Sequence, residues 1–195
     1  MSTFDLIRRY LVERARLGVF IPLAVLLALT GRVFSPSGFG SLSGFLGAAS
    51  QALILALAFR IWDDLEDRQR DATDHPNRVM VVSGETGPFV MLMLVLAVVG
   101  MAPVVVLASH AVDRLVALDI AIGILLVCYR LRWRRSVFGG YVVLVKYPAI
   151  AFIVAPAAPS PLVLALLYFL ICVFETLDDR ALRASITSFF GHRVP

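Results

Sequence analysis

The segment Arg60-Ile-Trp-Asp-Asp-Leu-Glu-Asp-Arg-Gln-Arg-Asp-Ala-Thr-Asp-His-Pro-Asn-Arg78 follows directly on an apolar run, and it decides how the chain is organised. Six carboxylates lie in the twelve positions from Asp63 to Asp74. If the preceding helix continues through the segment, Asp64, Asp67 and Asp71 lie on one helix face. Asp63 lies on the flank of that face, and Asp74 lies one turn beyond it. Stacked like charges cost roughly 0.2–0.5 kcal/mol per pair on an exposed helix, so this density needs a compensating cation.

Oxygen-only ligands indicate which cation the cluster would hold. Mg²⁺ takes one or two carboxylates and completes its shell with water and phosphate oxygens, whereas a zinc site needs Cys or His ligands and no cysteine lies nearby. The alternative is a solvated acidic helix end whose charges are interleaved with Arg68 and Arg70. The sequence favours a site for Mg²⁺ and phosphate over that alternative.

The composition is that of an integral membrane protein. The chain has 195 residues, of which 59% are hydrophobic and 16% charged, and its mean hydropathy is +0.86. Six apolar runs are each near the roughly 20 residues that cross a bilayer as a helix. We therefore expect an all-α membrane protein with one transmembrane domain over residues 1–195. An amphipathic segment is expected at 1–16 and a tail at 180–195. The six helices are expected near 17–33, 44–62, 88–108, 115–129, 137–156 and 162–177.

The basic residues predict the orientation. Of 18 Lys and Arg residues, fifteen lie in four groups, before the first run, in 60–78, in 130–135 and in 180–193. Only Arg32 and Arg114 fall on the other side. The positive-inside rule then places both termini and the acidic segment in the cytoplasm of a multi-pass protein of the cell inner (plasma) membrane. The net charge of +4 is a topology signal, and we expect no nucleic-acid partner.

The sequence contains one lysine, Lys146, which lies inside the fifth apolar run. A lysine near the bilayer centre costs a few kcal/mol, so we expect it to face the bundle interior and a carboxylate or phosphate, with snorkelling to the headgroups as the alternative. Gln51, in the second run, is expected to hydrogen-bond between helices. Pro76 should end the acidic helix and leave Val79–Gly84 irregular, with Arg78 beside the carboxylates, either neutralising an acid or binding a phosphate.

Two further stretches point toward the same membrane surface. The basic loop Tyr129–Arg135 serves either as a topology and lipid-headgroup signal or as a counter-charge to a polyanion. On a helix, the end of the sixth run forms a second acidic face from Glu175, Asp178 and Asp179. Two acidic clusters at cytoplasmic helix ends, with Arg and Lys between them, predict a diphosphate held through two Mg²⁺ ions.

These motifs resemble those of the UbiA superfamily of intramembrane prenyltransferases. Asp63–Asp71 is similar to the family's NDxxDxxxD motif, with Asp63 in the place of Asn, and His75-Pro-Asn-Arg78 followed by Ser83-Gly84 resembles its continuation. The loop from Tyr129 resembles the YxxxK segment, with Arg132 or Arg134 in the role of the lysine. Glu175–Asp179 resembles a reduced second DxxxD motif with Glu in the leading position.

The resemblance implies Mg²⁺-dependent ionisation of a polyprenyl diphosphate and transfer of the prenyl group to an acceptor. It implies catalytic roles for Asp67, Asp71 and Lys146, substrate binding by Asn77, Arg78, Tyr129, Arg132 and Arg134, and metal binding by Asp63, Asp64, Asp67, Asp71, Glu175, Asp178 and Asp179. The family has nine helices and six are expected here, so a second copy or a partner subunit would complete the lipid cavity. The alternatives are a non-catalytic UbiA-like scaffold or subunit, a UbiA-type terpene cyclase and, with less support, a small transporter.

Overall fold

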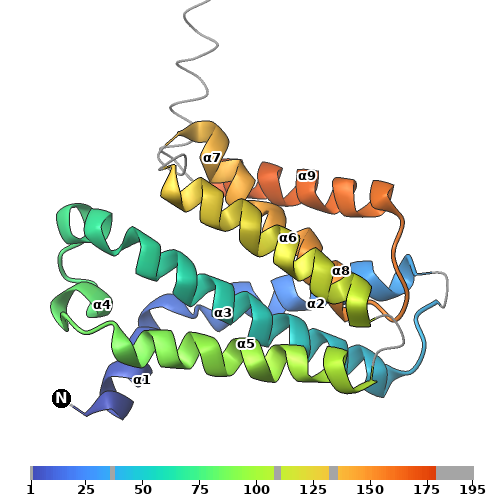
Figure 1. Cartoon of the computed structure of the whole chain (residues 1–195), viewed down its shortest axis with the longest axis horizontal. Helices are drawn as coiled ribbons and strands as arrows, with labels where there is room; N and C mark the ends of the chain where they lie inside the picture. The colour runs from blue at the N-terminus through green and yellow to red at the C-terminus, as the bar shows by residue number, and fades with distance from the viewer. Residues whose placement is uncertain (1, 36–37, 108–110, 132–135, 179–195) are drawn as a thin grey trace, which may run out of the picture.

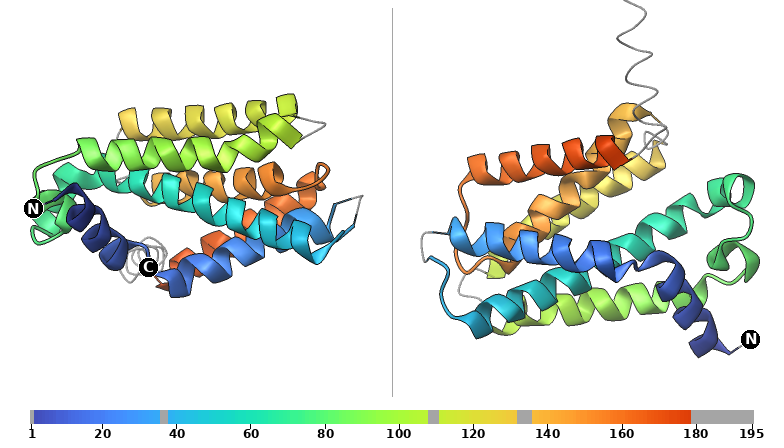
Figure 2. Two further views of the ribbon diagram at one scale, coloured as in Figure 1. Left: turned by 90° about the horizontal axis from the view of Figure 1, so that it is seen from below. Right: turned by 180° about the vertical axis from the view of Figure 1, so that it is seen from behind.

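Helices form all the regular secondary structure of the residues that the computed structural model describes, which are 2–35, 38–107, 111–131 and 136–178. In chain order they are α1 (Thr3–Arg14), α2 (Leu17–Val33), α3 (Leu42–Asp74), α4 (Val79–Val82), α5 (Gly87–Leu107), α6 (Ala111–Arg130), α7 (Val137–Val142), the 3-10 helix η2 (Val143–Val145), α8 (Lys146–Val154) and α9 (Pro161–Asp178). Helices α3, α6 and α9 run in one direction and α2, α5 and α8 in the other (Figures 1 and 2).

Two of the described helices are long and apolar enough to cross a membrane: α3 and the stretch Gly87–Val106 of α5. Helices α1 and α2, which meet at an angle of 72°, would count as a third span if they are taken as one broken helix. Shorter apolar helices cover Phe138–Val154 and Pro161–Leu177. The chain is thus an all-helical protein with two or three helices suited to a bilayer, which is compatible with a membrane location.

Helix α3 passes without a break through the acidic segment. Ser41 caps its start, because the hydroxyl accepts a hydrogen bond from the Gly44 amide at 3.1 Å. The helix extends twelve residues beyond Trp62, where its apolar run ends, and stops at Asp74. Pro76 accounts for the stop, since proline lacks the N–H that would continue the helix.

The expectation that Val79–Gly84 is irregular was wrong for Val79–Val82 and holds for Ser83 and Gly84. Residues Val79–Val82 form the one-turn helix α4, and the Glu13 carboxylate accepts a hydrogen bond from the Val79 amide at 3.0 Å. A carboxylate at a helix N-terminus satisfies a free N–H group and interacts favourably with the helix dipole. The stabilising group thus comes from α1, far away in sequence.

The fifth apolar run is helical from Val137 to Val154, close to the predicted 137–156, but it is not one uniform α-helix. It forms α7, then the 3-10 turn η2, then α8, which starts at Lys146. Pro148 explains the change, because it cannot donate to the carbonyl of Leu144 four residues earlier, and the chain tightens there instead.

Close helix contacts hold the bundle around α3. Helix α3 packs mainly on α5 and α2, and α2 also packs on α8. Gln51 of α3 donates to the Gly100 carbonyl of α5 at 2.8 Å, which confirms its expected interhelical role. A Cβ at Gly31 would stand 2.6 Å from the carbonyl oxygen of Ala151, so the approach of α2 to α8 requires glycine.

A small second core fixes α1 and α4 to the acidic end of the bundle. It consists of Leu6, Tyr10, Ile61, Met80 and Phe89. The rings of Tyr10 and Phe89 lie 5.0 Å apart. The N-terminal amphipathic helix therefore packs its apolar face on protein, and this places its charged residues beside those of α3.

Candidate functional site

A buried ion pair links the acidic segment to the lysine of the fifth apolar run. The Lys146 ammonium donates to one carboxylate oxygen of Asp63, and the Tyr129 hydroxyl donates to the other. Asp63 is 4% exposed and Lys146 is 2% exposed. The expectation that Lys146 faces the interior and a carboxylate is confirmed. Three helices, α3, α6 and α8, meet at this contact, which we call the Asp63 triad.

Asp64, one residue further on, points to α1 instead. It accepts hydrogen bonds from the Tyr10 hydroxyl at 2.8 Å and from the Arg14 guanidinium at 2.5 and 3.0 Å. Arg60, one helical turn earlier, approaches it to 3.3 Å. Burial, followed by the negative charge and hydrogen bond of Asp64, raises the pKa of Tyr10, which keeps the hydroxyl protonated as a donor. Asp64 thus anchors the N-terminal helix in the folded chain.

Asp71 is paired across the turn that follows α3. Its carboxylate forms an ion pair with Arg78, and its side chain is buried. Of the two uses expected for Arg78, neutralising an acid is the one present in this structure. Asp67 lies one turn from both Asp63 and Asp71 and is partly buried.

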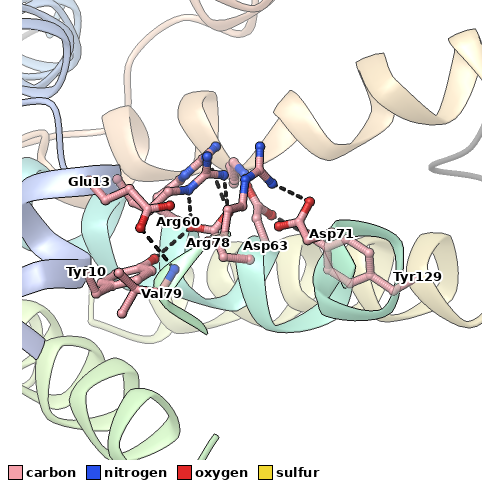
Figure 3. A network of polar contacts seen from close by, with 11 residues as sticks. Tyr10, Glu13, Arg60, Asp63, Asp71, Arg78, Val79 and Tyr129 are labelled. Atoms are coloured by element: carbon pink, nitrogen blue, oxygen red, sulfur yellow. Dashed lines mark hydrogen bonds and ion pairs between the residues drawn. The ribbon is translucent and has the colours of Figure 1, made fainter. Parts of the chain in front are cut away.

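Cations therefore face each of the three buried carboxylates of α3. Figure 3 shows part of this network, with Asp63, Asp71 and Arg78 labelled. Lys146 stands against Asp63, Arg14 and Arg60 against Asp64, and Arg78 against Asp71, so the buried charges nearly cancel. Within the described part of the chain, no group of three or more Asp, Glu, His or Cys side chains is arranged to hold a metal ion. Side-chain cations provide the compensation that the sequence assigns to metal.

Helix α1 contributes Tyr10, Glu13 and Arg14, none of which is predicted from the sequence as a site residue. The signal that identifies them is their spacing, because Leu6, Tyr10 and Arg14 recur every four residues and so share one helix face. The sequence predicts only an amphipathic segment here and does not say what the face contacts. In the structure, this face carries the apolar and basic groups that meet α3.

The second acidic segment is only partly described. Helix α9 ends on the same side of the bundle as α3 (Figures 1 and 2). Glu175 is exposed and lies at the edge of an apolar groove of about 390 Å³ between α2, α8 and α9, which Tyr147 also lines. Among the other predicted site residues, Asn77 is exposed in the turn after α3. Asp178 is the last residue of α9, and its side chain lies outside the described part, as do Arg132, Arg134 and Asp179.

The Asp63 triad and the Asp71–Arg78 pair lie along the same stretch of α3, about 12 Å apart at 1.5 Å of helix rise per residue. Together they form alternating acidic and basic groups at one end of an apolar bundle. Such a site can bind an anion through its cations or a cation through its carboxylates, provided that the internal pairs open. Comparison of the chain with protein-family models, curated proteins and solved structures gave no match.

Proposed function

We propose that the chain is a UbiA-like intramembrane prenyltransferase that ionises a polyprenyl diphosphate and transfers the prenyl group to a nucleophilic acceptor. The Asp63 triad is the observation that carries the proposal. Burying a lysine and an aspartate costs several kcal/mol per ion before pairing, and apolar residues of similar size often stabilise a core as well or better. A charge pair kept in so apolar a bundle favours a functional role over a purely structural one.

The ion pairs supply the groups that a diphosphate needs. In the proposed complex, Lys146 leaves Asp63 and Arg78 leaves Asp71, and both donate N–H bonds to diphosphate oxygens. The exchange keeps every charge paired, because the carboxylates lose their cations only when another cation arrives with the substrate. The site can therefore stay stable when it is empty and still bind a trianionic ligand.

The donor set fits a Mg²⁺ ion that enters together with the diphosphate. Mg²⁺ is usually held by one or two carboxylates plus substrate phosphates, so a closed protein cage is not required. Asp67 would hold it together with Asp63 or Asp71, each of which lies one helical turn away, and Glu175 near the end of α9 would contribute from the second acidic segment. When bound, Mg²⁺ would neutralise the negative charge of the leaving diphosphate.

In the proposed reaction, the bond between the prenyl C1 carbon and the diphosphate oxygen breaks, and its electron pair leaves with the diphosphate. The acceptor atom forms the new bond to C1 and loses a proton. Lys146 and Arg78 stabilise the charge that develops on the leaving group. The apolar groove beside Tyr147 offers a surface for the prenyl chain, and the Tyr147 ring lies next to Lys146, with the ammonium 5.4 Å from its centre.

The proposed topology follows from the same arrangement. Six apolar stretches cross the inner (plasma) membrane, both termini are cytoplasmic, and the acidic ends of α3 and α9 share the cytoplasmic face. A second copy of the chain or a partner subunit would cover the groove between α2 and α9.

The test compares two carboxylates on one helix in purified protein reconstituted in lipid. Pyrophosphate release is measured with Mg²⁺ and a panel of prenyl diphosphates of different length. We expect Asp71→Asn to lower the rate by roughly 100-fold or more, since it removes a carboxylate from the site. Asp74→Asn is the matched control, because Asp74 is exposed and also pairs with an arginine, Arg70, at 3.0 Å. Wild-type protein that neither binds these diphosphates nor releases pyrophosphate would rule the proposal out.

A non-catalytic membrane subunit is the second candidate. It is favoured by one observation, the pairing of Asp63, Asp64 and Asp71 with side-chain cations, which also suits a permanently structural network. Under this alternative, cells that carry the Asp67→Ala variant show the same phenotype as cells that carry the wild-type protein, and not that of cells lacking the protein. A UbiA-type cyclase instead gives a cyclised hydrocarbon from the diphosphate when no acceptor is present.

A further inference from the structure

A second cavity lies at the end of the bundle opposite the acidic segment. Its volume is about 480 Å³, and it is lined by the C-terminal ends of α2, α5 and α8 and the N-terminal parts of α3 and α6. Figures 1 and 2 show these helix ends gathered away from α1 and α4. Two arginines line the cavity, Arg32 from α2 and Arg114 from α6, together with Gln51 of α3.

Backbone carbonyls hold both guanidinium groups in place. Nε of Arg32 donates to the carbonyl of Phe39 at 2.9 Å, and Nη2 of Arg114 donates to the carbonyls of Ala155 and Pro156 at 2.5 and 3.1 Å. A guanidinium has five N–H donors, so these bonds use only part of each group's capacity. Carbonyls also bring no negative charge. Both side chains are therefore positioned by neutral groups rather than by carboxylates.

No carboxylate reaches this cavity from its described lining. The sequence contains no Asp or Glu between Glu13 and Asp63, which covers the lining parts of α2 and α3. Two like charges at the edge of an apolar bundle are unfavourable unless an anion accompanies them. Arg32 and Arg114 are also the two arginines that depart from the positive-inside pattern of the sequence. Both facts favour an anionic ligand.

The wall that α3 contributes leaves room for such a ligand. A Cβ at Gly44 would stand 2.6 Å from Nη2 of Arg32, so glycine permits the position of that guanidinium. A Cβ at Gly47 meets nothing within 4 Å. Gly47 therefore borders open space inside the cavity rather than a packed neighbour.

We propose that this cavity, which we call the Arg32/Arg114 pocket, binds a phosphate group through the two guanidiniums. Arginine forms paired hydrogen bonds with phosphate oxygens, which matches two oriented guanidiniums with unused donors. The phosphate belongs to an anionic lipid headgroup or to a free phosphate ion. The pocket lies at the other end of the bundle from the acidic segment, so the proposal does not rest on the proposed prenyl transfer.

The test uses the full chain in two arms. In the first, native mass spectrometry measures how much phosphatidylglycerol or phosphatidylcholine stays bound to protein released from mixed-lipid nanodiscs. In the second, the thermal midpoint is measured in phosphatidylcholine nanodiscs as inorganic phosphate is added. The variants are Arg32→Gln and Gly47→Leu, and the control is Arg68→Gln, since Arg68 also donates to a backbone carbonyl, that of Gly84 at 2.7 Å, but at the acidic end.

We expect roughly tenfold or greater weakening of anion binding in Arg32→Gln and Gly47→Leu, and wild-type binding in Arg68→Gln. Gly47→Leu keeps both arginines and adds a side chain to the cavity wall, so it separates occupancy of the pocket from loss of charge. A response to phosphatidylglycerol alone identifies a lipid headgroup, and a response to inorganic phosphate identifies a free ion. The proposal is overturned if wild type responds to neither, or if Gly47→Leu binds as wild type does.

Discussion

Removing the lysine of the Asp63 triad should destabilise the protein far more than removing any surface charge. Lys146→Met leaves the Asp63 carboxylate buried at 4% exposure with the Tyr129 hydroxyl as its remaining donor of the triad. Breaking a buried pair in this way costs about 3–5 kcal/mol. Asp63→Asn should cost a similar amount, because it removes the carboxylate charge that the buried ammonium faces.

The double variant separates the pair from its parts. With both charges gone, Asp63→Asn/Lys146→Met should be less destabilised than the sum of the single changes by at least about 2 kcal/mol. The control is Arg70→Gln, which breaks an ion pair whose side chains are 58% and 45% exposed. It should cost at most about 0.5 kcal/mol.

The assay is reversible unfolding in mixed micelles of dodecyl maltoside and SDS, with free energies obtained from the unfolding midpoint and slope. The reasoning is refuted if Lys146→Met costs less than about 1 kcal/mol, or if the two single changes add without coupling. Either result would mean that Asp63 and Lys146 do not form a desolvated pair.

Three further outcomes are expected. Gly31→Ala should cost about 1–3 kcal/mol, because its Cβ meets a backbone carbonyl. Gly100→Ala meets only side-chain atoms among its nearest neighbours, those of Leu55 and Ile54, and should cost less when both variants are unfolded in parallel. Gln51→Leu should lower the unfolding free energy by about 0.6 kcal/mol, and a loss above about 2 kcal/mol would contradict a single interhelical hydrogen bond. The stability gap between wild type and Tyr10→Phe should be constant below about pH 9 and shrink above about pH 10, because the pKa of Tyr10 is raised in the folded state and its contribution is lost only at alkaline pH. A gap that grows with pH would contradict this sign.

Local patterns in the sequence predicted the features that depend on local energies. The inward position of Lys146 followed from the cost of a charge in hydrocarbon, and the end of α3 followed from the missing N–H of Pro76. Arg78 was expected beside the carboxylates because only a short turn separates it from Asp71. Each of these conclusions depends on a residue and its near neighbours.

Long-range partners could not be predicted in the same way. Arg14 and Asp64 are 50 residues apart, and Glu13 and Val79 are 66 apart, so no local pattern reveals that α1 folds against α3 and α4. The sequence shows an excess of carboxylates at the end of the second run, but not which cation each one meets. Metal ions and side-chain cations satisfy the same charge requirement, and only the packing of α1, α6 and α8 distinguishes them.

Helix α3 is longer than a bilayer's hydrocarbon layer requires. Its 33 residues extend about 50 Å, whereas the hydrocarbon layer is about 30 Å thick. If its apolar part starts that layer at Leu42, the layer ends after about 20 residues, close to Trp62, and Asp63 is the first residue outside it. A thicker bilayer would submerge Asp63 and Lys146 unless the helix tilts less or the lipids around it thin, so lipid chain length should set how readily this end of the protein opens to water.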